Sequence, residues 1–362
     1  MALGGQAKNS LCFAKGDSAY LSRAHADLNN PADYLNFVKD AKYFLKNSPK
    51  IIACDLHPEY QSSKFAHDLA IGARRLSLIQ HHHAHIASCM AENGLKNKKV
   101  IGVAFDGTGL GEDSQIWGAE FLVADYKNFQ RRAHLKEIPL LGGEKAILEP
   151  YRLAVAWLYR IYKDKFLDLD IDFVKAIDKE HWRVLKNMYL SGFNSPLASS
   201  MGRLFDAAGS LILGKNKVGF EAELAIALEK IAARYSKSVS GYKFDIIKNK
   251  GTYIIDPQSA FKEMVNGLKA KEPRGKMALR FHLTVAQMIR RTSLLLRKET
   301  KINKVVLSGG VFQNKLLLGM SLSLLYKEGF KVFQHNIVSC NDSGISLGQA
   351  AIAGLSRSST IS

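Results

Sequence analysis

The sequence has few cysteines and no long apolar run. Its four cysteines, Cys12, Cys54, Cys89 and Cys340, occur singly, which argues against a zinc knuckle or a disulfide framework. No segment approaches the roughly 18 consecutive apolar residues of a membrane span. The opening MALGGQAKNSLCF also lacks the apolar core of a signal peptide. We therefore expect a cytoplasmic globular protein that makes no use of a membrane.

Acidic residues are fewer than basic ones. The chain has 51 Lys and Arg against 33 Asp and Glu, a formal net charge of +18. Such a balance favours anionic partners, which include nucleic acid, nucleotides and acidic protein surfaces. The lysines are dispersed, as in KNSPK and KNKK, and dispersed charge is more often a solvated surface than a binding groove. We therefore expect no nucleic-acid groove, although the charge alone leaves RNA contact open.

The order of predicted elements indicates a duplicated α/β fold. Low-complexity tracts and solenoid repeats are absent, and 362 residues suffice for two packed domains. Three predicted strands followed by alternating helices and strands, the order of a ribonuclease-H-like half, occur at the start and again from Val100. The first half has predicted helices over 34–45 and 61–75. Helices between about 149 and 298, one of them over about 173–190, form an insertion before a predicted strand at 304–307. We predict two lobes, 1–125 and 126–362, with a cleft between them and the final helix, 344–355, packed on the first lobe.

Histidines dominate the segment QHHHAHIASC, residues 80–89, which lies between a predicted strand, 76–79, and a predicted helix, 86–95. His81 and His85 are four residues apart, so on a helix both rings can face one ion. A lone pair with this spacing is usually not a metal site, but Asp106 in VAFDGTG and Asp342 in CNDSGIS also follow predicted strands. We predict that these four residues hold a catalytic divalent metal between the lobes. Imidazole and carboxylate ligands suit iron or zinc.

Glycine-rich turns follow three of the predicted strands. Without a Cβ atom, their backbone amides can approach phosphate oxygens closely. One such turn is usually only a turn, but three of them suit a triphosphate held in a cleft, and a nearby lysine adds positive charge. The predicted phosphate-binding residues are Gly4, Gly5, Lys8, Gly107, Thr108, Gly109, Gly309 and Gly310.

A second polar cluster lies in residues 200–229. Arg203, Asp206 and Glu221 stand beside an apolar helix face and could reach a ribose. An exposed helix face with a charged loop explains the same pattern equally well.

Six segments, in this order, carry a family resemblance: QHHHAHIASCMAENGL, VAFDGTGLGEDSQIWGAEFLVAD, GGEKAILEPYRLA, SSMGRLFDAAGSL, LSGGVFQNKLLL and NDSGISLGQAAIA. The chain resembles, over essentially its whole length, the C-terminal, TsaD-like half of the hydrogenase-maturation carbamoyltransferases of the HypF family. That half is similar to tRNA threonylcarbamoyl-transfer proteins and has the actin/hexokinase/Hsp70-type ATPase fold. The resemblance implies metal ligands at His81, His85, Asp106 and Asp342. It implies an adenosine pocket at Gly202, Asp206, Glu221, Gly309, Gly310 and Asn314.

The resemblance also implies an activity and its partners. The chain would pass a carbamoyl group from carbamoyl-adenylate to the C-terminal cysteine thiolate of a HypE-like protein, on the route to the cyanide ligands of [NiFe]-hydrogenase. The nucleotide ligand would be ATP or carbamoyl-adenylate. Because only one half of the family's pattern is matched, we expect a separate adenylate-forming, YrdC-like domain or protein to supply the intermediate.

One departure from the family pattern keeps other functions open. The segment usually read as YEGQAA is FEAELA here, so Ala222 replaces a glycine and Glu223 a glutamine. This change makes a non-catalytic nucleotide-binding subunit a reasonable alternative. Threonylcarbamoyl transfer to tRNA is a further alternative, with the positive charge as its only independent support.

Overall fold

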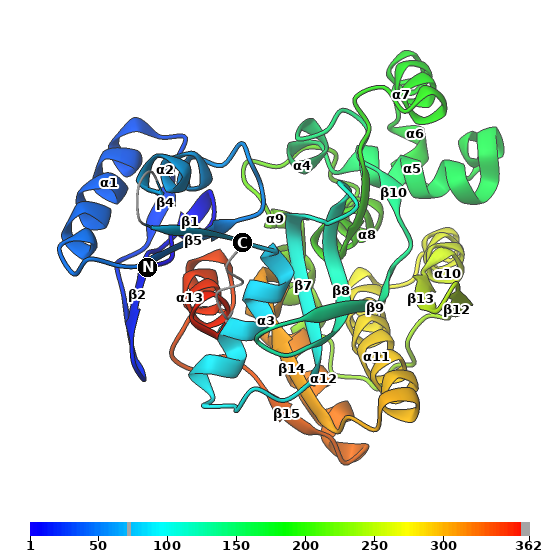
Figure 1. Ribbon diagram of the computed structural model, residues 1–362. Coiled ribbons are helices and arrows are strands. Elements are labelled where there is room, and N and C mark those ends of the chain that lie inside the picture. Colours follow the sequence, from blue (N-terminus) through cyan, green and yellow to red (C-terminus); the bar gives the residue numbers. More distant parts are fainter. Residues whose placement is uncertain (71–73, 356–362) are drawn as a thin grey trace.

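The largest sheet runs through residues 100–333 of the computed structural model, which describes residues 1–70 and 74–355 (Figure 1). Among these residues it has nine strands, in the order β12-β13-β9-β8-β7-β14-β15, with β11 paired to β8 and β10 to β11. The central strands read VIGVAF and KVVLS and are buried on both faces, as expected under covering helices. The strands are β7 (Val100–Leu110), β8 (Ile116–Ala124), β9 (Phe129–Leu135), β10 (Ile138–Pro139), β11 (Leu197–Ser200), β12 (Asp245–Asn249), β13 (Thr252–Asp256), β14 (Lys304–Ser308) and β15 (Lys331–Phe333).

The strand directions confirm the predicted α/β class and its repeated order. β7, β8 and β9 form an antiparallel meander, and β14 and β15 continue the sheet parallel to β7. The N-terminal elements follow the same plan, with Ala2 in place of a first strand. Ala2 forms an antiparallel β-bridge with Cys12 and a parallel β-bridge with Ala53. The strands here are β1 (Ala7–Asn9), β2 (Cys12–Lys15), β3 (Ser18–Leu21), β4 (His25–Asp27), β5 (Ile51–Asp55) and β6 (Arg75–Ile79).

Helices cover both parts of the chain and fill the predicted insertion (Figure 1). The helix predicted over 61–75 ends at Leu69, and residues 71–73 lie outside the described part. The helix predicted over 173–190 is broken in two because Asp178 caps a new helix, accepting hydrogen bonds from the amides of Glu180 and His181. The helices are α1 (Pro31–Leu45), α2 (Gln61–Leu69), α3 (His81–Glu92), α4 (Lys145–Leu148), α5 (Tyr151–Tyr162), α6 (Asp172–Lys175), α7 (Lys179–Ser191), α8 (Met201–Leu213), α9 (Glu223–Ala233), α10 (Gln258–Lys269), α11 (Arg274–Thr300), α12 (Lys315–Lys327) and α13 (Ile345–Leu355), with shorter turns η1 (Lys163–Asp168), η2 (Gly310–Gln313) and η3 (Asp342–Gly344).

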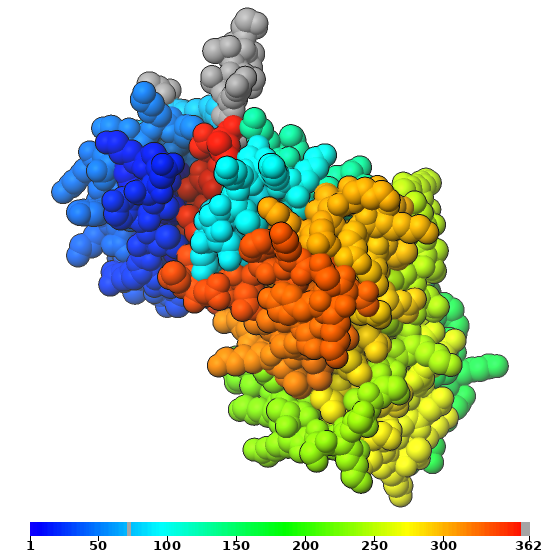
Figure 2. All heavy atoms as spheres, turned by 90° about the horizontal axis from the view of Figure 1, so that it is seen from below, coloured from blue at the N-terminus to red at the C-terminus, as the bar shows by residue number. Residues whose placement is uncertain are grey.

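The last helix returns to the N-terminal part of the chain. Helix α13 packs against α3 and also contacts β5 and β2. Figure 2 shows its red residues between the blue N-terminal elements and the cyan residues around α3. The two helices approach closely at Gly348, where a Cβ atom would lie 1.9 Å from the carbonyl oxygen of Ala84. Residues from both ends of the sequence are thereby brought to one place.

The packing places residues 100–124 with the later part of the chain. Residue 125, the predicted lobe boundary, lies in the turn between β8 and β9, which pair with each other in the large sheet. A boundary drawn on sheet membership therefore falls before Val100. None of the helices in the described ranges is long and apolar enough to cross a bilayer.

Candidate functional site

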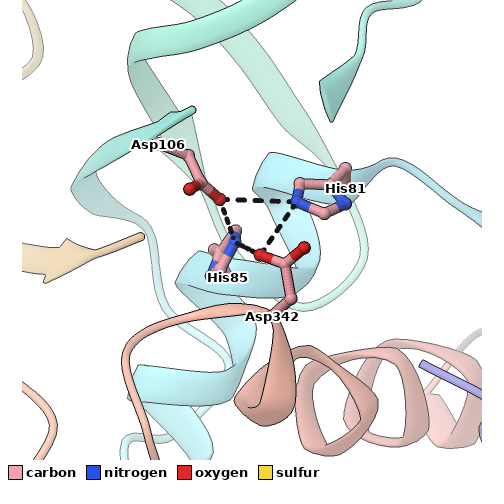
Figure 3. A group of neighbouring side chains, drawn as sticks. All are labelled: His81, His85, Asp106 and Asp342. Carbon is pink, nitrogen blue, oxygen red and sulfur yellow. Dashed lines mark hydrogen bonds and ion pairs between the residues drawn. The ribbon is translucent and has the colours of Figure 1, made fainter. Parts of the chain in front are cut away.

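The structure brings together the four predicted metal ligands. One ligand atom from each of His81, His85, Asp106 and Asp342 lies within 4.8 Å of the others (Figure 3). Nε2 of His85 is 2.8 Å from Oδ2 of Asp106 and 3.6 Å from Oδ1 of Asp342. Nε2 of His81 is 3.5 Å and 3.7 Å from the same two oxygens. Residues separated by up to 261 positions thus converge on one point, while their role as metal ligands stays a prediction.

Each of these residues is positioned by a local feature of its element. Helix α3 begins at His81, five residues earlier than predicted, because the side chain of Gln80 caps it by accepting a hydrogen bond from the amide of His83. His81 and His85 therefore share one helix face. Asp106 lies where the pairing of β7 with β8 shifts register between Phe105 and Gly109, and such irregularities re-aim side chains. Asp342 begins the short turn η3.

A third carboxylate, Asp55, orients His81. Oδ2 of Asp55 is 2.8 Å from Nδ1 of His81, and both side chains are fully buried. This contact places the Nδ1 proton on the Asp55 side and leaves Nε2 as the ring nitrogen that faces the four-residue group. Nε2 itself is buried without a good hydrogen-bond partner among the described residues. An orphaned buried nitrogen of this kind fits a cation ligand.

The charges around the group also favour a cation. Burial opposes a charged imidazole, but the carboxylates of Asp55, Asp106 and Asp342 outweigh it and raise the pKa of His81 well above its usual range. Burial likewise opposes ionisation of Asp106, but the neighbouring rings of His81 and His85 outweigh it and hold the pKa of Asp106 well below its usual range. Ionised carboxylates therefore surround the imidazoles. Two nitrogen and two oxygen donors fit a divalent ion such as zinc or iron.

A cavity of about 310 Å³ adjoins this group. Asp106 belongs to both, because its Oδ2 faces the histidines and the residue also lines the cavity. Its Oδ1 accepts hydrogen bonds from the amides of Gly107 at 2.8 Å and Gly310 at 3.3 Å. Seven predicted nucleotide-binding residues line the cavity: Lys8, Gly107, Gly202, Asp206, Glu221, Gly310 and Asn314.

The charged side of the cavity is centred on Arg203. Its guanidinium lies 3.1 Å from Oδ2 of Asp206 and 2.8 Å from Oε1 of Glu221. Lys8 is 3.9 Å from the other oxygen of Glu221. Burial raises the pKa of Asp206 to about 6, although Arg203 acts in the opposite direction. Because Arg203 is itself buried, the cluster is not the exposed helix face of the alternative interpretation.

The other predicted phosphate-binding residues lie outside the cavity lining. A Cβ atom at Gly309 would lie 2.2 Å from the carbonyl oxygen of Phe105, and one at Gly109 would lie 2.6 Å from the ring of His82. These glycines allow the backbone and side chains to pack closely, and their role in phosphate binding stays a prediction. The predicted phosphate-binding residues that do not line the cavity are Gly4, Gly5, Thr108, Gly109 and Gly309.

Asp55 and Ser308 were not predicted from the sequence. Ser308 ends β14, and its Oγ lies 3.5 Å from Nδ1 of His85. The sequence did contain a signal for Asp55, because Asp55 lies at the end of one predicted strand and the histidines directly follow the next. In the structure β5 and β6 are parallel with Asp55 opposite Ile79, so the residues after both strands meet at one edge of the sheet.

Comparisons with known proteins match nearly the whole chain. Residues 1–92 match the family model described as the HypF Kae1-like domain, and residues 102–349 match that of the carbamoyltransferase Kae1-like domain, second subdomain. Carbamoyltransferase HypF of Synechocystis sp. is 34% identical over 365 residues, which are 96% of this chain and 46% of that protein. The HypF homolog of Cupriavidus necator is 32% identical, over 98% of this chain and 91% of that protein.

Two solved HypF structures share the fold. A full-length HypF in its phosphate- and nucleotide-bound form matches with a TM-score of 0.89 and 39% identity, over 97% of this chain and 45% of that chain. HypF of T. kodakarensis matches with a TM-score of 0.86 and 28% identity, over 98% and 47%. This chain therefore spans about half the length of these HypF proteins. On both family models and on the agreement of fold, the chain belongs to the HypF family and corresponds to its Kae1-like, C-terminal half.

Proposed function

We propose that this chain performs the carbamoyl-transfer step of a HypF-type reaction in hydrogenase maturation. The carbamoyl donor is carbamoyl-adenylate bound in the cavity, and the acceptor is the C-terminal cysteine thiolate of a HypE-like protein. Relatives named carbamoyltransferase HypF and a nucleotide-bound HypF structure support this assignment. A separate adenylate-forming, YrdC-like domain or protein supplies the donor.

The observation that carries the proposal is the shared position of Asp106. This residue belongs to the group of four ligand side chains and also to the cavity lining. A nucleotide in the cavity would therefore present its phosphate end, and an acyl group attached there, close to His81 and His85. His81, His85, Asp106 and Asp342 would hold the cation. When bound, such an ion supplies Lewis acidity to a carbonyl or phosphoryl oxygen.

The chemistry needs little else from this chain. The partner's thiolate sulfur attacks the carbamoyl carbon, the bond from that carbon to the phosphate oxygen breaks, and AMP leaves with the electron pair. The protein binds and orients the adenylate, and Lys8, which lines the cavity together with Arg203, would balance charge on the leaving phosphate. The four cysteines of this chain are not used as nucleophiles. Burial raises the pKa of the Cys12 and Cys54 thiols to about 12 and that of the Cys340 thiol to about 11, and Cys89 is also buried with a raised pKa.

A transfer assay tests the proposal. Carbamoyl-adenylate with a labelled carbamoyl group is added to this chain and to a HypE-like protein ending in cysteine, and label on the acceptor is measured. We expect label on the terminal cysteine, and none when that cysteine is replaced by serine. We also expect no transfer from carbamoyl phosphate and ATP unless an adenylate-forming domain is added. Absence of label with intact carbamoyl-adenylate would contradict the proposal.

Nucleotide binding without turnover is the second candidate, and the backbone of Ala222 favours it. Ala222 lines the cavity with φ +66°, a left-handed conformation that suits glycine better. Glu223 pairs with Lys215 and accepts a hydrogen bond from the amide of Gly219, so it is held away from the cavity lining. This candidate predicts that ATP binds while no label is transferred. Transfer to adenosine in tRNA would instead support the threonylcarbamoylation alternative.

A further inference from the structure

A buried chain of hydrogen bonds leads from His85 to a carboxylate at the other end of its own helix. Oγ of Ser308 lies 3.5 Å from Nδ1 of His85 and 2.9 Å from Nε2 of His335. Nδ1 of His335 lies 2.8 Å from Oε2 of Glu92. The side chains of His335 and Glu92 are only 4% and 6% exposed, and Ser308 is fully buried. None of these three residues belongs to the four-ligand group.

Each hydrogen bond in this chain is donated in the same direction, from the His85 side toward Glu92. Burial opposes ionisation of Glu92, but the amides of Ile337 and Asn336 and the ring of His335 outweigh it and lower the pKa of Glu92. An ionised carboxylate only accepts hydrogen bonds, so Nδ1 of His335 must donate. Burial lowers the pKa of His335, so its ring is neutral and Nε2 accepts from the hydroxyl of Ser308. The serine oxygen can then accept from Nδ1 of His85, which leaves Nε2 of His85, the nitrogen that faces the two aspartates, to bind a cation in exchange for its proton.

Glu92 is itself firmly held. It is the last residue of α3, seven positions after His85, and a separation of seven on a helix keeps both residues on one face. Its Oε1 accepts hydrogen bonds from the backbone amides of Asn336 and Ile337. The side chain of Asn93 adds a bond of 3.0 Å to the carbonyl oxygen of Gln334. The segment that carries His335 is therefore fixed to the C-terminal end of α3.

We propose that Glu92, acting through His335 and Ser308, is a positioning residue that fixes the tautomer and the ring orientation of His85 for cation binding. The proposal rests on the proposed function, because it assumes that His85 is a metal ligand. In this proposal Glu92 orients His85 through two intervening side chains, as Asp55 orients His81 by a direct contact. Second-sphere acceptors of this kind hold a ligating imidazole in one orientation and strengthen its bond to the metal.

The experiment measures metal affinity rather than turnover. The full chain is stripped of metal with a chelator and titrated with Zn²⁺ in competition with a chromophoric chelator. We expect Ser308→Ala and Glu92→Gln each to weaken zinc binding by about 10-fold to 100-fold. Glu299→Gln is the control, because Glu299 also accepts hydrogen bonds, from the side chains of Arg132, Lys248 and Tyr253. It belongs to neither the ligand group nor the cavity lining. Its zinc affinity should equal that of the wild type.

A double-mutant cycle separates positioning from a general loss of structure. In the Ser308→Ala background, His335→Gln should cause no further loss of zinc affinity, because the path to His85 is already broken. Losses that multiply would overturn the proposal. Equal zinc affinity for wild type, Ser308→Ala and Glu92→Gln would overturn it as well, while leaving the metal site of the proposed function intact. A wild type that binds no zinc, Fe²⁺ or Co²⁺ would overturn both.

Discussion

Replacing Asp206 by asparagine tests how much the buried, ionised carboxylate beside the cavity destabilises the folded protein. The Asp206 side chain is about 5% exposed and lies 3.1 Å from a guanidinium nitrogen of Arg203. One of its oxygens has no hydrogen-bond partner among the described residues. The folded protein therefore holds an incompletely satisfied carboxylate at the edge of the cavity. Asparagine has nearly the same shape as the neutral acid, so Asp206→Asn removes the charge while keeping the packing.

The size of the effect follows from the pKa. Burial raises the pKa of Asp206 from 3.8 to about 6, and each pKa unit corresponds to about 1.36 kcal/mol. The ionised side chain thus costs the folded state about 3 kcal/mol at pH 8. Because the folded pKa is the higher one, the folded chain binds more protons than the unfolded chain between about pH 4 and pH 6. The stability contributed by this group therefore falls as the pH rises through that window.

Urea unfolding of wild type and Asp206→Asn from pH 5 to pH 8 measures this cost. We expect the variant to be more stable by about 3 kcal/mol at pH 8 and by about half of that at pH 5, with other titrating groups cancelling in the difference. If Asp206 contacts a ribose, the same variant should also bind ATP more weakly. A variant that is less stable than wild type at pH 8, or a stability difference that does not change with pH, would refute this account of Asp206.

Four further substitutions or additions test other parts of the structure. Asp55→Asn should weaken Zn²⁺ binding about 10-fold to 100-fold in chelator competition, because the acceptor for Nδ1 of His81 is altered; unchanged affinity would contradict that role. Ala222→Gly should raise the free energy of unfolding in urea by about 0.5–1 kcal/mol, because a left-handed backbone is relieved; a decrease would argue against strain there. Gly348→Ala should lower stability in thermal unfolding by about 1–3 kcal/mol, because its Cβ atom would overlap the carbonyl oxygen of Ala84; an unchanged Tm would show that α3 and α13 can separate freely. Zn²⁺ at about 100 times its Kd should stabilise the metal-free chain by about 2.7 kcal/mol, and calorimetry that shows no shift in Tm would count against a metal site.

The sequence predicted most of the fold because its elements follow from local patterns. The apolar strands 100–105 and 304–307 and the helix-forming spacing of 34–45 all have counterparts in β7, β14 and α1. Errors occurred at helix boundaries and breaks, where a single capping side chain decides. Gln80 starts α3 before the apolar spacing begins, and Asp178 divides a continuous helical pattern. Such caps depend on one hydrogen bond and leave little trace in hydrophobic periodicity.

Part of the candidate site could likewise be predicted from the sequence. The spacing of His81 and His85 required only that both residues share a helix. Asp106 and Asp342 were predicted as their companions because both follow predicted strands, and the resemblance to the HypF family implied the same two residues. The strand order placed residues 100–124 with the later sheet rather than with the first lobe. Sequence separation could not reveal this, because β7 pairs with β14 across about 200 residues.

What the sequence determined by itself is therefore local: which residues form helices, strands and glycine turns, and which histidines face the same way. Only the tertiary structure decided which distant groups meet. Asp55 reaches His81 because two parallel strands end at one edge, and Glu92 reaches His85 because Ser308 and His335 arrive from the far end of the chain. The physical reason is that backbone periodicity acts over a few residues, whereas side-chain contacts depend on how whole elements pack.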